Sequence, residues 1–196
     1  MGTRHVIAVK INKNYVVAQY GQWDGYPDGQ GVSCLDFLEK TNLDEFKNKL
    51  KLVRFKNEED SKELDDFLKS IGCKDGWMNM EQSSKYKQKY PLLSRDVGSD
   101  ILLKLMENEK EVFVNNAIDF VKDSLMCEWA YVIDFDKNSF EVYEGFNKSP
   151  LSEGDRFYFD NYSDNGYYPV KLKEKFSLID LPSEDYFLSC FKDEEY

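Results

Sequence analysis

A short segment near the N-terminus, QYGQWDGYPDGQG at residues 19–31, combines backbone freedom with aromatic rings and acids. It holds four of the chain's eleven glycines together with Trp23, Asp24, Tyr26 and Asp28. Glycine permits positive φ and close backbone approach, so the segment can wind tightly and turn successive N–H groups inward, while rings stack on a ligand and carboxylates accept hydrogen bonds from it. We interpret it as a candidate ligand site. The alternative interpretation is structural: the two acids close turns and the rings plug the edge of the core.

The known phosphate and metal motifs do not fit this segment. Its glycines do not follow the GxGxxG spacing, and no Lys-Ser/Thr pair follows them as in a P-loop. Two acids in five residues are too few for a tight calcium cage, and a single histidine rules out a zinc site made of several histidines. We therefore expect no metal and no cofactor.

Two arginines extend the candidate site. Arg95 and Asp96 precede an apolar stretch, where the guanidinium could hold a carboxylate or phosphate; the alternative is an Arg-Asp cap that ties a helix to the preceding loop. In a small-molecule site, Arg4 and Arg95 would clamp an anion and Asp24 would act as a base or an orienting acceptor. That hypothesis requires Arg4, Trp23, Asp24 and Arg95 to converge on one pocket.

Nucleophilic catalysis has little support in the sequence. The only histidine, His5, falls on the same face of a predicted strand as Ile7 and Val9, which favours a structural role. The cysteines are far apart and form no CxxC motif, so we expect reduced thiols in the core or on the surface: Cys34, Cys73, Cys127 and Cys190.

The elements that must position these residues follow from hydrophobic periodicity. Alternating and β-branched stretches predict one hairpin at residues 4–11 and 15–23, a second at 129–143, and short strands at 155–162 and 168–178. Apolar residues at helical spacing predict six helices. One begins at Val32, four lie at residues 43–53, 64–71, 101–106 and 114–125, and the last follows Pro182. We predict an irregular loop at residues 73–91, and we expect Ser94, Arg95 and Asp96 to cap the helix at 101–106.

Length and composition predict one folded unit. The chain has 196 residues, of which 41% are hydrophobic and 15% aromatic, and it shows no repeat, low-complexity tract or linker. We predict a single α+β domain over residues 1–196, in which two β-hairpin regions form a mostly antiparallel sheet and helices are inserted between them.

The charge excludes some partners. The formal net charge is −11, from 26 basic and 37 acidic residues, and no basic cluster stands alone. Direct binding to nucleic acid needs lysines and arginines that neutralise phosphates, so we consider it improbable for this chain, and the same holds for an anionic membrane. No stretch is long and apolar enough to span a membrane or act as a signal peptide, which predicts a cytoplasmic protein.

Several segments together resemble a family of small uncharacterised proteins found among bacteria, bacteriophages and some fungi. The segments are Gly2-Thr3-Arg4, WDGYPDGQG at 23–31, LSRDVGSDIL at 93–102, WAYVIDFDKNSFEVYEGF at 129–146 and YYPVKL at 167–172. The resemblance centres on the 23–31 loop but implies no activity, cofactor or catalytic residue. Its phage-associated members suggest an interaction with a host system, such as inhibition of a CRISPR defence complex.

The sequence favours a binding protein over an enzyme. Acidity, the lack of an assembled catalytic set and many aromatic side chains suited to an interface predict docking on another macromolecule, most plausibly a protein. The aromatic candidates are Trp77, Tyr86, Tyr90, Tyr158, Tyr162 and Tyr167. Two alternatives stay open: a small polar ligand bound or hydrolysed at the 23–31 loop, and a structural or immunity scaffold.

Overall fold

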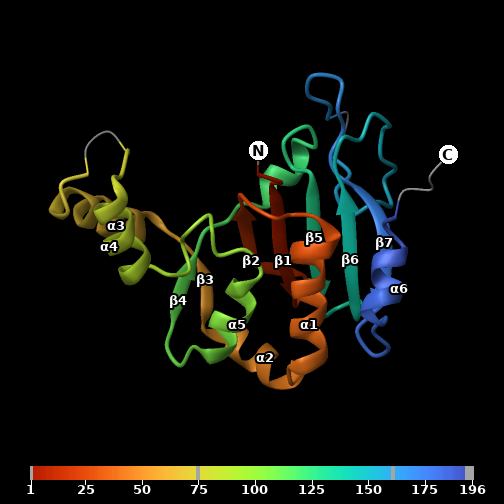
Figure 1. Ribbon diagram of the computed structural model, residues 1–196, viewed down its shortest axis with the longest axis horizontal. Helices are drawn as coiled ribbons and strands as arrows, with labels where there is room; N and C mark the ends of the chain where they lie inside the picture. The colour runs from red at the N-terminus through yellow and green to blue at the C-terminus, as the bar shows by residue number, and fades with distance from the viewer. Residues whose placement is uncertain (1, 74–75, 160–161, 193–196) are drawn as a thin grey trace.

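A five-stranded sheet forms the centre of the molecule (Figure 1). The computed structural model describes residues 2–73, 76–159 and 162–192. The strand order is β2 (Asn14–Gly21), β1 (His5–Ile11), β5 (Trp129–Asp134), β6 (Ser139–Glu144) and β7 (Lys171–Ser177). Neighbours are antiparallel except β1 and β5, which run parallel. The α+β class and both predicted hairpins are confirmed.

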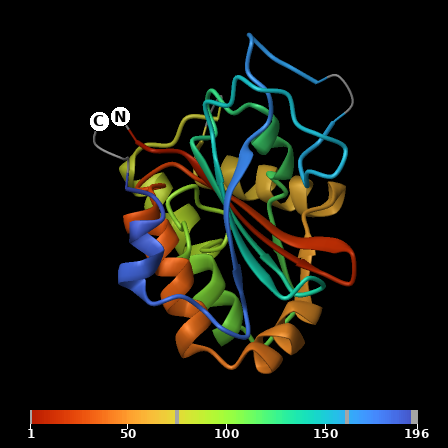
Figure 2. The same cartoon turned by 90° about the vertical axis from the view of Figure 1, so that its right-hand side faces the viewer.

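Four helices cover one face of this sheet, as the edge-on view in Figure 2 shows. They are α1 (Val32–Lys40), α2 (Leu43–Lys49), α5 (Asp100–Glu107) and α6 (Glu184–Ser189). Their apolar sides pack on alternate residues of the strands, including Ile7, Tyr131 and Phe140, and form the largest core cluster. The other face is covered as well, so β5 is buried along its whole length and β1 over its first five residues. Burial on both faces explains why these strands are rich in apolar residues at nearly every position.

Irregular chain covers the opposite face. The short 3₁₀ helix η3 (Ile118–Lys122) and the segment that follows β6 enclose a second apolar cluster, which contains Val6, Val132 and Phe157. At one end of this face, Arg156 bridges two carboxylates: its Nη2 lies 2.5 Å from Asp134 and its Nε lies 2.7 Å from Glu141. All three side chains are at least 95% buried.

Two further helices form an arm that projects from the sheet (Figure 1). We call residues 57–90, apart from 74–75, the helical arm; it contains α3 (Glu58–Ser70) and α4 (Met80–Lys89). A two-stranded parallel sheet of β3 (Val53–Phe55) and β4 (Val112–Val114) lies at its base, and the 3₁₀ helix η2 (Leu50–Leu52) leads into β3. Leu64, Tyr90 and Leu93 make a small core of their own there.

The structure corrects several local predictions. Residues 80–89, predicted as irregular loop, form α4, because Asn79 and Gln82 make a capping box at its start. The predicted helix at 114–125 is instead the end of β4 and η3. The described residues of the predicted strand at 155–162, which are 155–159 and 162, do not form a strand. Tyr90, predicted as an interface residue, is buried in the core of the arm.

The start of α5 also differs from the prediction. The helix begins at Asp100, and Arg95 and Asp96 lie in turns before it rather than in its cap. Asp96 instead contacts Trp23 and Lys87, as described below. The four cysteines are free thiols. None of the helices within the described ranges has the length and apolar character needed to cross a membrane.

Candidate functional site

The loop at 19–31 crosses over the side chain of His5, and this explains two of its glycines. A Cβ at Gly21 would lie 2.1 Å from His5 Nε2, and one at Gly25 would lie 2.9 Å from His5 Nδ1. The Gly25 N–H donates to the Thr3 carbonyl, and its own carbonyl accepts from the hydroxyl of Tyr131 at 2.8 Å. The loop is therefore fixed on the sheet, and its first glycines are required for close approach.

His5 is a structural residue beneath this loop. It is completely buried, and burial lowers its pKa to about 4, although a contact between Nδ1 and the Thr3 carbonyl at 3.5 Å acts in the opposite direction. The ring is thus neutral near pH 7 and shielded from solvent. The predicted position on the face of Ile7 and Val9 is confirmed.

One side of the loop faces the helical arm. The Trp23 indole N–H donates to Asp96 at 3.1 Å, and the other carboxylate oxygen of Asp96 accepts from Lys87 of α4 at 2.6 Å. The backbone carbonyl of Arg95 accepts from the Gln22 N–H, while its guanidinium is mostly exposed. Arg95 and Asp96 also line a hollow of about 500 Å³ against the arm, together with Trp77.

The other side of the loop borders a larger hollow at the end of the sheet where β5 begins and β6 ends. We call it the Tyr26 hollow; its volume is about 660 Å³. Tyr26 and Asp28 line it at the start of η1 (Pro27–Gly31), a single turn of π-helix that leads into α1. Its remaining walls are Pro27, Glu128, Trp129, Glu144, Phe146, Lys173, Leu188, Phe191 and Lys192.

Three backbone irregularities meet at the Tyr26 hollow. The first is the π-turn of η1 beside Tyr26. The second is Phe146, which has a φ of 52° and a ring that is 52% exposed. The third is a bulge in β7, where Lys173 is the extra residue and turns toward Glu144, at 2.9 Å. π-Turns, bulges and strained non-glycine residues concentrate at functional sites, so their convergence marks this hollow.

The conformation of Phe146 is imposed by its neighbours. A Cβ at Gly145 would lie 2.2 Å from the Cys127 carbonyl, and the Phe146 N–H donates to the Ser124 carbonyl at 2.7 Å. These contacts restrict the backbone path at the end of β6, and this path holds the Phe146 ring at the mouth of the hollow.

Arg4 reaches the same hollow indirectly. Its guanidinium lies 3.4 Å from Glu128, and its backbone N–H donates to the same carboxylate oxygen at 3.2 Å. Glu128 is one of the lining residues, so Arg4 orients a carboxylate of the hollow rather than facing a ligand itself.

Six of the seven candidate residues thus separate into two groups. Tyr26 and Asp28 line the Tyr26 hollow, to which Arg4 is linked, whereas Trp23, Arg95 and Asp96 face the helical arm. Asp24 belongs to neither: its carbonyl accepts from Gln30, and its carboxyl group packs over Gly29. The sequence drew no attention to Phe146, Lys173 or Phe191, because positive φ at a phenylalanine and a bulge leave no recognisable residue signature.

Asp24 allows a test of the structural interpretation of the loop. Its φ is 58°, a conformation that asparagine and aspartate tolerate better than other residues with a side chain. We expect Asp24→Ala to lower the free energy of unfolding by about 1 kcal/mol and Asp24→Asn by less than about 0.5 kcal/mol, measured by chemical denaturation. Equal losses in the two variants would contradict this account and assign the effect to the charge.

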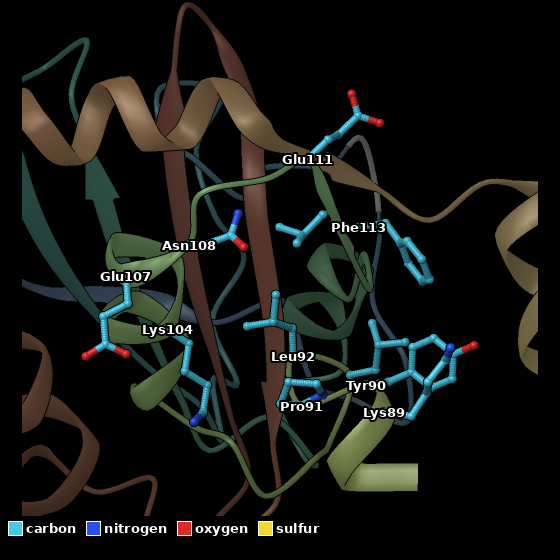
Figure 3. Close-up of a pocket in the computed structure, with 11 residues that line it drawn as sticks. Lys89, Tyr90, Pro91, Leu92, Lys104, Glu107, Asn108, Glu111 and Phe113 are labelled. Carbon is cyan, nitrogen blue, oxygen red and sulfur yellow. The ribbon is translucent and has the colours of Figure 1, made fainter.

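A third hollow, of about 430 Å³, lies at the base of the helical arm (Figure 3). Tyr90, Pro91 and Leu92 line it from the end of the arm, and Phe113 lines it from β4. Its rim has both signs of charge, from Lys89, Lys104, Glu107 and Glu111. None of the seven candidate residues of the ligand site lies here, and the charges of this hollow do not converge on one type of ligand.

No family model, curated protein or solved structure matches the chain. The proposed function therefore rests on the geometry of the hollows and of the helical arm.

Proposed function

We propose that the protein is a binding protein that docks on a basic macromolecular surface through its helical arm. The observation that carries this proposal is the exposure of two large apolar side chains of the arm, just before and at the first residue of α4. Trp77 is 86% exposed and Met80 is 91% exposed, whereas single large apolar residues elsewhere on the surface are scattered. Tryptophan and methionine are enriched at protein interfaces, where they serve as anchors.

The charge of the arm supports a basic partner. Helix α3 has six acidic residues and two lysines, and all its acids except Asp60 are exposed. Two of the lysines of α4 are already neutralised, Lys85 by Glu81 and Lys87 by Asp96. With a net charge of −11 for the whole chain, the arm would be steered toward positive surfaces.

Proteins that bind nucleic acids have such positive surfaces, since they neutralise phosphates. A host complex that handles nucleic acids is therefore the class of partner we favour. Because the 23–31 loop resembles a family with phage-associated members, a CRISPR defence complex is a specific candidate within this class.

The proposal is tested with a variant that alters only these two exposed side chains of the arm. Tagged full-length protein and its Trp77→Ser/Met80→Ser variant serve as baits in a bacterial lysate, and captured proteins are quantified by mass spectrometry. We expect the variant to capture a protein with a basic surface at least about tenfold less than the wild-type protein does, because it lacks both interface anchors. Raising the salt should also weaken capture by the wild-type protein.

Ile179→Ser provides the matched control, because Ile179 is 84% exposed but follows β7, far from the arm in the chain. It should capture the partner as the wild-type protein does. Capture of nothing above background, or equal capture by the arm variant, would refute docking through the arm.

A further inference from the structure

The Tyr26 hollow has the chemistry of a ligand site that is separate from the docking arm. Its volume of about 660 Å³ is within the range of small-molecule pockets, and apolar and aromatic groups make up most of its walls. Tyr26 and Phe146 each expose about half of their surface, at 51% and 52%. Their rings thus offer free faces at the mouth, whereas Trp129 and Phe191 pack edge to face, with centroids 5.9 Å apart, at the wall.

The fixed charges of the hollow are mainly negative. Asp28, Glu128 and Glu144 lie on η1, at the start of β5 and at the end of β6. Glu144 is paired with Lys173, and Glu128 with Arg4. Asp28 has no ion-pair partner within the described ranges, so it is the carboxylate that can accept a charged group from outside.

The positive groups are less suited to hold a ligand. Lys173 is held by Glu144 at 2.9 Å, and Lys192 lies beyond the end of α6 instead of on a helix or strand. An anionic ligand that used Lys173 would have to displace its ion pair with Glu144, and only Lys192 would then offset the repulsion by Asp28 and Glu128. A cation would meet an unpaired carboxylate and the electron-rich faces of aromatic rings, which together are the features of a cation–π site.

We propose that the Tyr26 hollow binds an organic cation, namely an alkylated ammonium group with an apolar shell. The methyl groups of such a cation would contact Tyr26, Phe146 and Leu188, and Asp28 would balance its charge. The site does not depend on docking through the arm. The same chemistry occurs in a free quaternary ammonium compound and in a trimethylated lysine of a protein, and the test distinguishes these sources.

The test is an NMR titration of the full-length protein that follows its tryptophan indole N–H signals. The probes are choline, a short peptide with trimethyllysine, and 3,3-dimethylbutanol, the neutral carbon analogue of choline. We expect the Trp129 signal to shift with a cationic probe while the Trp77 signal stays unchanged, and we expect the cation to bind about tenfold more tightly than the neutral analogue. Tighter binding of choline would indicate a free ligand, and tighter binding of the peptide a protein side chain.

Two variants assign the binding to the hollow. Asp28→Asn should weaken the cation at least about fivefold and leave the neutral analogue unchanged, because only the charge interaction is removed. Tyr26→Leu should weaken the cation by a similar factor, since it keeps an apolar side chain but removes the ring face. Asp65→Asn, the same chemical change on exposed α3, is the matched control and should bind like the wild-type protein.

Three results would overturn the proposal. The neutral analogue could bind as tightly as choline, Asp28→Asn could leave the affinity unchanged, or neither cationic probe could shift the Trp129 signal at millimolar concentration. None of these results bears on capture by the helical arm, so failure of this site and failure of the docking proposal are distinguishable.

Discussion

Arg156→Met should lower the free energy of unfolding by about 3–5 kcal/mol, because it removes the guanidinium that bridges two buried carboxylates and leaves only Lys175, 3.5 Å from Glu141, as a positive partner. Asp134 and Glu141 are at least 97% buried, and the guanidinium bridges them at 2.5 and 2.7 Å. Tyr143 and Ser139 complete the network through hydrogen bonds to Glu141. Chemical denaturation at pH 7 measures the loss.

A neutral version of the network provides the control. The triple variant Asp134→Asn, Glu141→Gln, Arg156→Met has no charge left to desolvate, so its stability should lie closer to that of the wild-type protein than Arg156→Met does. A single variant that loses less than about 1 kcal/mol, or a triple variant that loses more than the single one, would contradict the role of the bridge.

The same network predicts how stability depends on pH. Burial alone would raise the pKa of Glu141, but the hydrogen bonds from Arg156, Tyr143 and Ser139 outweigh it and lower the pKa to about 2. A carboxyl group whose pKa is lower in the folded state stabilises the fold above its unfolded pKa, here 4.5. That contribution should be lost as the pH falls from about 4.5 toward 2, and this part of the pH profile should be absent in Arg156→Met.

Protonation of His5 should affect the stability of the protein in a different pH range. Burial lowers its pKa from 6.5 to about 4, so the unfolded chain takes up a proton before the folded one does. Stability contributed by neutral His5 is complete above pH 6.5 and should be lost as the pH falls to about 4. The two steps are therefore separable in one denaturation series.

Phe187→Ala is the second substitution with a large expected effect, about 3–5 kcal/mol of lost stability. Phe187 is fully buried and anchors α6 on the sheet: its ring stacks on Phe140 with centroids 6.0 Å apart and packs against Phe176 and Phe191 at 5.4 and 4.9 Å. Since Phe191 follows α6 and lines the Tyr26 hollow, the same change should also open that wall. Thermal and chemical denaturation measure the stability.

The preceding residue of α6 supplies the control. Tyr186 is exposed, so Tyr186→Ala should change the stability by no more than about 0.5 kcal/mol. Alanine has a higher helix propensity than tyrosine or phenylalanine, so neither loss can come from helix propensity. Comparable losses for Tyr186→Ala and Phe187→Ala would therefore contradict the account that packing of the buried ring holds α6 in place.

The sequence was sufficient to predict elements whose pattern is local. Alternation in RHVIAVKI and in WAYVIDF gave the strands of both hairpins, and apolar spacing gave α1, α3 and α5. The parallel pairing of β1 with β5 could not be predicted, because it depends on where the inserted helices return the chain. α4 was missed because its sequence, MEQSSKYKQK, has no apolar face, and only the capping box at Asn79 signals its start.

The candidate site was predicted in part. Tyr26 and Asp28 were singled out from the sequence and do line a hollow, but Arg95 faces the arm and Asp24 only shapes the turn. The opposite wall comes from β6, β7 and α6, more than a hundred residues away in the chain, and its position follows from tertiary packing. The resemblance to a phage-associated family stays a prediction.

The parallel pairing of β1 with β5 also has a consequence for biosynthesis. It joins His5 to Trp129 and Lys10 to Asp134, so the central strand β5 and its neighbour β1 come from distant parts of the chain. On the ribosome, the backbone groups on the inner edge of β1 stay unpaired, and its apolar side chains stay uncovered, until β5 emerges after the helices between them have been made. Such long-range contacts slow folding, and the nascent N-terminal hairpin is therefore the part of the protein that depends most on protection by chaperones.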